Sequence, residues 1–379
     1  MKSVIYIGGF NLPDKNAAAQ RVIAVSRIFL KLGYRVTLVG LSPDKSCCNK
    51  LFDFSGLKCI NLPYPKSLRQ WWKYLFSIKQ YIPFITEQTE FVVAYNYPAI
   101  ALSNLIKRNS KNGIRTYSDC TEWYEPKGNI FFRIIKKWDV RRRMYNVQCK
   151  LDGVISISRY LYDFYKQRKV NTILLPPLVD KEEEKWNQIE TNRKKVDNTV
   201  RILYAGSPGG MKDRLDVVLN ALSGLKTERA IIFDIVGLTK NQYIKKYAKD
   251  NEMRIPEFVT FYGRLPHKTV IKMLKDSDFQ MFFREDNIVT RAGFPTKFAE
   301  TISAKTIPVT SHTSNIEDYL IDGYNGFFID IETVESMKHK LEIILSLTRE
   351  EIDVIKEHID ENTFDYHQYV NEIKTFISV

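Results

Sequence analysis

Residues 201–214 read RILYAGSPGGMKDR, and this stretch decides the fold class of the second half of the chain. Residues 201–205 form a short apolar run typical of a buried strand, and a glycine-rich turn follows directly. We expect a helix to begin near Lys212. A strand that passes through glycines into a helix turns backbone amides and a positive helix end toward an anion, so the stretch predicts a diphosphate site. The alternative is an ordinary turn with a solvated lysine.

The same alternation of apolar strands and amphipathic helices extends in both directions along the chain. Helices are expected over residues 16–32 and 366–377. Further strands are expected over residues 3–8, 35–41, 91–95, 114–118, 154–157, 230–236, 259–262, 279–283 and 306–310. Such alternation predicts an α/β protein with parallel sheets covered by helices on both faces. We therefore expect two Rossmann-like doubly wound domains facing each other across a cleft, with ligands at the carboxyl ends of the strands.

One polar stretch interrupts this alternation and suggests where the two domains meet. After Pro176-Pro177, residues 181–199 are crowded with charge and almost free of apolar residues, as in a linker. The expected N-terminal domain is residues 1–180, and the expected C-terminal domain is residues 200–363. The final helix, within residues 364–379, is expected to pack back on the N-terminal domain.

Charge is divided unevenly between the halves of the chain. Residues 1–180 contain 29 Lys and Arg against 12 Asp and Glu, a net charge of +17, whereas residues 181–379 carry −4. A basic field of this size attracts polyanions such as the anionic face of a membrane. No stretch approaches the roughly 20 apolar residues that span a bilayer, and no signal peptide is evident. We expect a cytoplasmic protein, peripheral on the cytoplasmic face of the membrane.

A second segment, residues 291–309 (RAGFPTKFAETISAKTIPV), again leads from a loop into a helix and then into a strand. Gly293, Phe294, Pro295 and Thr296 lie where a helix begins, so their amides can face a phosphate or sugar hydroxyls. Lys297 and Glu300 are three residues apart and share one helical face. A carboxylate there can accept two hydrogen bonds from a ribose diol. The alternative is a surface ion pair between these two side chains.

Together these segments resemble the C-terminal domain of GT-B glycosyltransferases, especially glycosyltransferase family 4 of the bacterial surface-polysaccharide type. The order and spacing of the matching motifs carry the resemblance, which also reaches the N-terminal half. In the second half the matching residues are Gly206, Lys212, Gly263, Asp278, Gly293, Phe294, Glu300, Pro308-Val309 and residues 322–328. In the first half they are Gly8-Gly9, residues 17–21, residues 152–158 and Pro176.

The resemblance implies a hexosyltransferase that takes its donor from a UDP- or GDP-sugar and needs no other cofactor. The implied donor-binding residues are Gly9, Gly206, Ser207, Lys212, Arg214, Arg264, Gly293, Phe294, Pro295, Thr296, Lys297 and Glu300. The implied catalytic residues are Lys212, Arg291, Asp119 and Glu122. The resemblance implies transfer with retention of configuration, in which a phosphate oxygen of the departing donor can take the acceptor's proton in place of a strong protein base. No bound metal is expected, because nearby cations and helix dipoles can neutralise the diphosphate.

Three departures from the family pattern bear on these roles. The first of the family's two glutamates is Ala292 here, beside Arg291, and the arginine after the first glycine turn is Ser207. Arg214, Arg264 or Arg291 can replace that arginine. The family's N-terminal histidine is Thr121, and all five histidines lie after residue 260. A base in the acceptor domain is therefore expected to be a carboxylate, namely Asp14, Asp119 or Glu122.

Two stretches of the N-terminal half, residues 66–76 and 131–143, predict amphipathic helices that mix aromatic and basic side chains. Such helices can lie in a membrane interface, although packed aromatics with solvated basic faces are an equal alternative. The residues assigned to the acceptor and the membrane are Arg21, Trp71, Trp72, Arg141, Arg142 and Arg143. The acceptor expected on this basis is a glycan or a lipid-linked acceptor.

Other classes of protein remain open to different degrees. A nucleic-acid-binding protein would need a recognition motif, and none is present, so no nucleic-acid partner is expected. A sugar-nucleotide 2-epimerase shares the same architecture but needs no basic acceptor face. A non-catalytic homologue is allowed because Ala292 stands where the family has its first glutamate.

Overall fold

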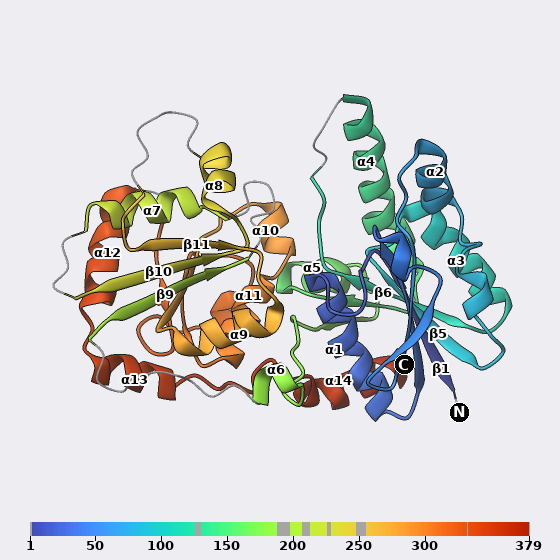
Figure 1. Cartoon of the computed structure of the whole chain (residues 1–379). Coiled ribbons are helices and arrows are strands. Elements are labelled where there is room, and N and C mark those ends of the chain that lie inside the picture. Colours follow the sequence, from blue (N-terminus) through green and yellow to red (C-terminus); the bar gives the residue numbers. More distant parts are fainter. Residues whose placement is uncertain are drawn as a thin grey trace. The chain divides into compact units, whose positions relative to one another are not determined.

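The computed structural model describes residues 2–125, 130–187, 198–206, 213–225, 229–247, 255–331 and 333–378, without the side chains of residues 131 and 132. The chain divides into two compact units (Figure 1). Unit 1 comprises Met1–Val179, Arg291–Phe294 and Tyr366–Val379, and unit 2 comprises Asp180–Thr290 and Pro295–Asp365. Each unit is a sheet covered by helices. None of the helices in the described residues is both long and apolar enough to cross a bilayer.

Unit 1 alternates strands and helices along almost its whole length. Its strands are β1 (Ser3–Gly8), β2 (Arg35–Ser42), β3 (Leu51–Phe54), β4 (Leu57–Pro63), β5 (Thr89–Tyr95), β6 (Arg115–Cys120), β7 (Gly153–Ser156) and β8 (Thr172–Leu174). Its helices are α1 (Ala17–Lys31), α2 (Leu68–Phe76), α3 (Ala99–Lys111), α4 (Ile130–Arg142), α5 (Arg159–Lys166) and α14 (Val370–Ser378). Short helical turns are η1 (Lys45–Cys47), η2 (Ile82–Phe84), η3 (Arg143–Val147), η4 (Gln148–Lys150) and η6 (Tyr366–Tyr369).

The sheet of unit 1 has the strand order β3-β4-β2-β1-β5-β6-β7-β8, and only β3 pairs antiparallel to its neighbour. Because the other strands are parallel, their carboxyl ends lie along one edge. The register places Gly8 beside Tyr95, and Tyr95 beside Asp119. The strand order reverses at β1, so ligands are expected at this edge beyond β1 and β5.

Both faces of this sheet are covered, as the unbroken apolar runs predict. Side chains alternate along β1: Val4 and Tyr6 join a core with α1 and α14, whereas Ile5 and Ile7 join a second core with α3. Figure 1 shows α1 and α14 together on one face of the sheet and α3 on the other. The unit therefore has two separate apolar layers, one on each face.

The last helix, α14, completes the first of these layers. Phe376 lies 5.3 Å, centroid to centroid, from the Tyr117 ring of β6. Its ring also fills the space above Gly153, where a Cβ atom would lie 2.6 Å from Phe376 Cζ. Asn171 Nδ2 donates to the carbonyl of Phe376 at 3.3 Å. Glycine at position 153 is thus required by the close approach of α14 rather than by its backbone conformation.

In the described residues of unit 2, the strands are parallel and lie in the order β11-β10-β9-β12-β13-β14, so the order reverses between β9 and β12. Its strands are β9 (Val200–Ala205), β10 (Ile231–Val236), β11 (Val259–Gly263), β12 (Phe279–Phe282), β13 (Ile307–Thr310) and β14 (Phe327–Phe328). Its helices are α6 (Glu184–Asn187), α7 (Leu215–Ser223), α8 (Lys240–Tyr247), α9 (His267–Asp276), α10 (Ile288–Ala292, whose last two residues group with unit 1), α11 (Thr296–Ser303), the turn η5 (Ile316–Asp318), α12 (Val334–Ser346) and α13 (Arg349–Glu357).

The expected α/β class and the two Rossmann-like sheets are confirmed, and every expected strand is a strand within two residues at either end. Both expected amphipathic helices are present as α2 and α4. The sequence analysis missed the β3–β4 hairpin, whose turn is Ser55-Gly56, and the short strands β8 and β14. Within the expected linker, α6 belongs to unit 2 and buries Trp186; residues 188–197 lie outside the described residues.

Candidate functional site

The carboxyl edge of the unit 2 sheet begins with Gly206, directly after β9. Its φ of +151° favours glycine, and a Cβ atom there would lie 2.8 Å from Lys297 Nζ. Its amide donates to the carbonyl of Val236 at 3.0 Å, which extends the β9–β10 pairing into the turn. Ser207 and Lys212, the next two predicted donor residues, lie outside the described residues.

A buried charge cluster lies beside this turn and is centred on Asp213. Lys297 Nζ is 2.6 Å from Asp213 Oδ2, and Arg284 Nε is 3.0 Å from Asp213 Oδ1. The hydroxyl of Tyr204 donates to Oδ2 at 2.8 Å. Side-chain exposure is 4% for Asp213, 9% for Lys297 and 14% for Arg284. We call Tyr204, Asp213, Arg284 and Lys297 the Asp213 cluster.

The two cations decide the charge of Asp213. Burial alone would raise the pKa of this carboxyl, but Lys297 and Arg284 outweigh burial and hold the pKa well below its usual value. Burial lowers the pKa of Lys297, and Asp213 opposes that effect. The interpretation of Lys297 as a partner of Glu300 on a helix surface is wrong, because Lys297 is buried and pairs with Asp213.

Glu300 lies one turn further along α11 and has a different partner. Its Oε1 is 3.0 Å from His267 Nε2, at the first residue of α9. The side chains of Glu300 and His267 are 16% and 19% exposed, so the carboxylate remains accessible to a ligand. Pro295 precedes the first residue of α11, Thr296, as the sequence predicts. Gly293 and Phe294 group with unit 1, together with Arg291, whose side chain is exposed.

The remaining predicted donor arginines differ in what they already bind. Arg214 Nη2 is 3.0 Å from Asp216, and Nη1 is 2.6 Å from Glu285, so both ends of its fork are occupied. Arg264 is exposed and follows β11, the outermost strand of the sheet. Gly9 follows β1 in unit 1, where the space above it is open apart from the Tyr74 hydroxyl.

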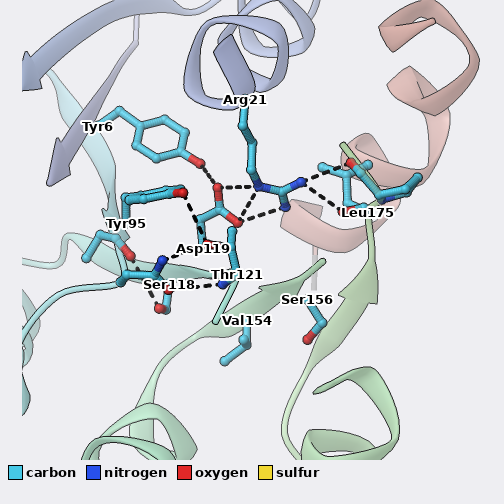
Figure 2. Close-up of polar contacts among 12 residues, drawn as sticks. Tyr6, Arg21, Tyr95, Ser118, Asp119, Thr121, Val154, Ser156 and Leu175 are labelled. Atoms are coloured by element: carbon cyan, nitrogen blue, oxygen red, sulfur yellow. Dashed lines mark hydrogen bonds and ion pairs between the residues drawn. The ribbon is translucent and has the colours of Figure 1, made fainter. Parts of the chain in front are cut away.

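In unit 1 the predicted residues Arg21 and Asp119 bind each other instead of facing solvent (Figure 2). Arg21 Nε lies 2.9 Å and 3.0 Å from the two oxygens of Asp119, and its Nη1 donates to the carbonyls of Leu175 and Pro176. The Tyr6 hydroxyl donates to Asp119 Oδ2 at 2.6 Å. Asp119 is fully buried and Arg21 is 2% exposed. The predictions of Asp119 as a base and of Arg21 as an acceptor or membrane residue are therefore wrong.

Glu122 lies beyond β6 at the same edge and is only partly buried. The loop before it is fixed by Thr121, whose amide donates to Asn96 Oδ1 at 3.0 Å and whose hydroxyl donates to Tyr95 at 3.1 Å. Arg143 Nη2 donates to the Glu122 carbonyl at 3.2 Å. Of the three predicted bases, Asp14 and Glu122 are both only partly buried, whereas Asp119 is fully buried.

The residues predicted to face a membrane divide into exposed and buried sets. Trp72 is 57% exposed, Arg141 and Arg142 are exposed, and Trp71 is partly buried against Tyr64 and Tyr74. Arg143 is 1% exposed and bonds to backbone carbonyls, so its assignment to the membrane is wrong. His367 groups with unit 1, and its ring lies 4.0 Å, centroid to centroid, from that of Tyr366.

The sequence analysis missed Asp213, Arg284, Tyr204 and His267 as parts of the site. Arg284 directly follows residues 279–283, an expected strand, and polar residues at the carboxyl end of such a strand are a usable signal. Asp213 lies within residues 201–214, but nothing in that pattern assigned it a role. In the described residues no group of three or more His, Cys, Asp or Glu side chains is arranged to hold a metal ion.

The architecture and this edge of unit 2 define a protein with the GT-B fold. More particularly, residues 185–360 match the model of the family Glycosyl transferases group 1, so unit 2 carries a glycosyltransferase domain and glycosyl transfer is its class of reaction. A comparison with curated protein sequences found no match.

Several solved structures share the fold of the whole chain. Sucrose-phosphate synthase from Thermosynechococcus elongatus has a TM-score of 0.72 at 11% identity, covering 100% of this chain and 98% of that chain. Anabaena Alr3699/HepE, solved with UDP and glucose, has a TM-score of 0.69 at 12% identity, covering 100% of both chains. The lipopolysaccharide outer core galactosyltransferase WaaB has a TM-score of 0.65 at 15% identity, covering 99% of both chains.

Proposed function

We propose that this glycosyltransferase moves a hexosyl group from a UDP- or GDP-sugar to a glycan or a lipid-linked acceptor, in the synthesis of a surface polysaccharide. The observation that carries the donor side is the Gly206 turn, which ends β9 directly above the cationic side chain of Lys297. The ammonium group of Lys297 beside this strand end would attract a diphosphate. The structure of Anabaena Alr3699/HepE with UDP-glucose, which has the same fold, supports this choice of donor.

In the proposed reaction, the bond between the sugar C1 and the diphosphate oxygen breaks, and a bond from the acceptor oxygen to C1 forms with retained configuration. The acceptor proton passes to an oxygen of the departing diphosphate. Glu300, held by His267, accepts hydrogen bonds from the ribose. Lys212 stabilises the charge that develops on the leaving diphosphate, and Arg291 assists it. Glu122 is available to orient the acceptor hydroxyl.

The donor proposal is tested with the purified chain and labelled sugars. UDP and GDP are first compared by thermal shift, because a ligand that binds only the native state raises the melting temperature. Labelled sugars on the preferred nucleotide are then incubated with candidate acceptors. Transfer supports the proposal; conversion of the donor to its 2-epimer supports the epimerase, and no reaction with any donor supports a non-catalytic homologue.

Two variants and one chelator test the assigned chemistry. Lys212→Ala should lower turnover at saturating donor by about 100-fold or more, as the loss of a preorganised charge in an active site does. Full turnover in this variant would remove Lys212 from the mechanism. We also propose that transfer needs no bound metal. Activity that EDTA abolishes and magnesium restores would contradict that proposal.

We further propose that unit 1 docks on an anionic membrane surface, where it meets its acceptor. On α4, Ile130, Ile134 and Trp138 are 74%, 63% and 49% exposed and recur every four residues, so they form one stripe. Arg142 lies over the Trp138 ring at 5.1 Å. On α2, the exposed Leu68, Trp72 and Phe76 repeat the same spacing; both helices pack against α3. We call these two sets the interfacial stripes.

The interfacial stripes belong to the half of the chain that carries a charge of +17, which complements an anionic bilayer. The test is co-sedimentation with vesicles of neutral phosphatidylcholine or with added anionic phosphatidylserine. Binding should require the anionic lipid, fall at high salt, and weaken when Arg141 and Arg142 become Ser or when Trp72 and Trp138 become Ser. Equal sedimentation with neutral and anionic vesicles, or with neither, would refute docking and leave the donor site unaffected.

A further inference from the structure

Arg284 occupies the position in unit 2 where a bound anion is expected on topological grounds. It lies two residues beyond the end of β12, and Gly206 follows β9 directly; the two strands are neighbours. The strand order reverses between these two strands. In open parallel sheets ligands bind outside the carboxyl ends of the strands at such a reversal. Arg284 and the Gly206 turn therefore flank the expected ligand position.

Among the described residues, the side chain of Arg284 is hydrogen-bonded through Nε alone. Its Nε is 3.0 Å from Asp213 Oδ1. Its backbone is fixed as well, because its amide donates to the hydroxyl of Ser311 at 2.8 Å and its carbonyl accepts from that hydroxyl at 2.7 Å. Within the part of the chain that the structure describes, Nη1 and Nη2 make no hydrogen bond. The guanidinium is thus pre-oriented, with its two terminal nitrogens available to a planar or tetrahedral anion.

The charge balance of the Asp213 cluster also points to an anion. Within the cluster one carboxylate, Asp213, pairs with both Lys297 and Arg284, and the carboxylate of Glu300 also acts on Lys297. All three side chains are at most 14% exposed. Arg284 therefore shares its carboxylate with Lys297, and an anionic ligand would give the guanidinium a partner of its own. Lys297 Nζ lies 2.8 Å from the Cβ position built on Gly206, so we expect the anion to lie next to this residue.

The other arginines of unit 2 that were candidates for this role are less suited to it. Both terminal nitrogens of Arg214 bind carboxylates, Asp216 and Glu285. Arg264 follows β11, which β10 separates from β9. An arginine at either position would have to break an ion pair or reach across a strand. Arg284 needs neither rearrangement.

We infer that the guanidinium of Arg284 binds the diphosphate of the sugar-nucleotide donor through Nη1 and Nη2. Asp213 is a positioning residue that holds Arg284 and Lys297 beside the Gly206 turn. This inference rests on the proposed donor site in unit 2 and adds the residue that recognises its second phosphate. It predicts that Arg284 contributes to the affinity for a diphosphate far more than to that for a monophosphate.

The experiment compares UDP with UMP, and GDP with GMP, by isothermal titration calorimetry on the full chain. The variants are Arg284→Ala, Arg284→Lys and a control, Lys268→Ala, which removes one positive charge from an exposed side chain of the same unit. Arg284→Ala should weaken the diphosphate by roughly ten- to a hundredfold, as for a lost charged hydrogen bond. The monophosphate and the control should change by less than about threefold. Arg284→Lys should recover only part of the loss, because lysine lacks the fork.

The outcomes separate the inference from the donor site on which it rests. If the wild-type chain binds neither UDP nor GDP, the donor site and the inference both fail. If it binds one of them and Arg284→Ala leaves its affinity unchanged, only the inference fails. Equal weakening of diphosphate and monophosphate would show a structural role and would also overturn it. Should Arg284→Ala not fold, Arg284→Lys decides, since full diphosphate affinity in that variant would refute recognition by the fork.

Discussion

Arg21 and Asp119 form an ion pair in which both side chains are almost completely removed from water, at 2% and 0% exposure, with Nη2 2.8 Å from Oδ1. The pair joins α1 to β6, and the Tyr6 hydroxyl adds β1 to the same network. Burial and the neighbouring carboxylate raise the pKa of Tyr6 well above its usual value, so its hydroxyl stays a donor. The carboxyl edge of unit 1 is therefore built on a fixed charge pair.

Asp119→Asn should destabilise unit 1 severely, because it leaves the Arg21 guanidinium charged and buried without a carboxylate. Removing one partner of a buried pair costs about 3–5 kcal/mol. Urea unfolding followed by fluorescence measures the change. Arg115→Gln, which removes a partly exposed cation that pairs with Glu90 at 2.8 Å, is the control and should cost under about 1 kcal/mol. A loss below about 1 kcal/mol for Asp119→Asn would contradict this account.

Asp213 should make the stability of unit 2 depend on acid pH. Its pKa in the folded state lies below the ordinary value of 3.8, so its stabilising contribution is complete well above that pH. As the pH falls, the Asp213 carboxyl takes up a proton in the unfolded state before it does so in the folded state. The contribution to stability is therefore lost as the pH falls through the lowered pKa. The difference in unfolding free energy between wild type and Asp213→Asn should be about 3 kcal/mol at pH 7 and shrink below about pH 4. A difference that stays constant from pH 7 to pH 3 would exclude this role.

His267 should act on the donor through Glu300. Glu300→Gln is expected to weaken UDP or GDP binding by about 1–3 kcal/mol, as for a charged hydrogen bond to the ribose. His267→Ala should weaken it by a smaller amount, because the carboxylate loses the partner that orients it. Calorimetry on both single variants and the double variant gives the coupling. Strictly additive losses would mean that His267 and Glu300 act independently.

Gly153→Ala should destabilise unit 1 by roughly 1–3 kcal/mol, because the new methyl group overpacks the contact with Phe376. Replacing the Phe376 ring by the smaller leucine side chain, in the double variant Gly153→Ala/Phe376→Leu, should recover part of the lost stability. The coupling is read from urea unfolding of the two single variants and the double variant. Gly113→Ala provides a contrast, since nothing lies within 4 Å of its Cβ position and its cost would come from its φ of +67° alone. No rescue by Phe376→Leu would mean that α14 does not pack as described.

The strands and the α/β class were predicted well, because an apolar run is compatible with few kinds of secondary structure. Short apolar runs bounded by turn residues, such as residues 201–205, favour buried strands, and each expected strand was found. β8 and β14 have three and two residues, which is too short for a pattern to show. The β3–β4 hairpin lies at the sheet edge, where β3 is only half-buried and lacks an apolar run.

The candidate site was predictable only where its residues are neighbours in sequence. The spacing of Lys297 and Glu300 predicted that they share one helical face. In the structure Lys297 is buried and forms its ion pair with Asp213, which is 84 positions away in the sequence. Arg21 and Asp119 are 98 positions apart and appeared as two independent functional residues. The sequence around a charged residue does not show whether its side chain is buried, because burial depends on tertiary packing.

Because α14 packs on the sheet of unit 1, unit 1 cannot complete its fold during translation until after all residues of unit 2 have been made. Asn171 and Phe376, which are in contact, are 205 positions apart. At about 5–20 residues per second, translation separates them by roughly 10–40 s. During that interval Gly153 and Tyr117 lack the ring that covers them. Unit 2 needs no residue beyond Asp365, so the unit that begins later is complete first, and the earlier one waits with an open apolar layer.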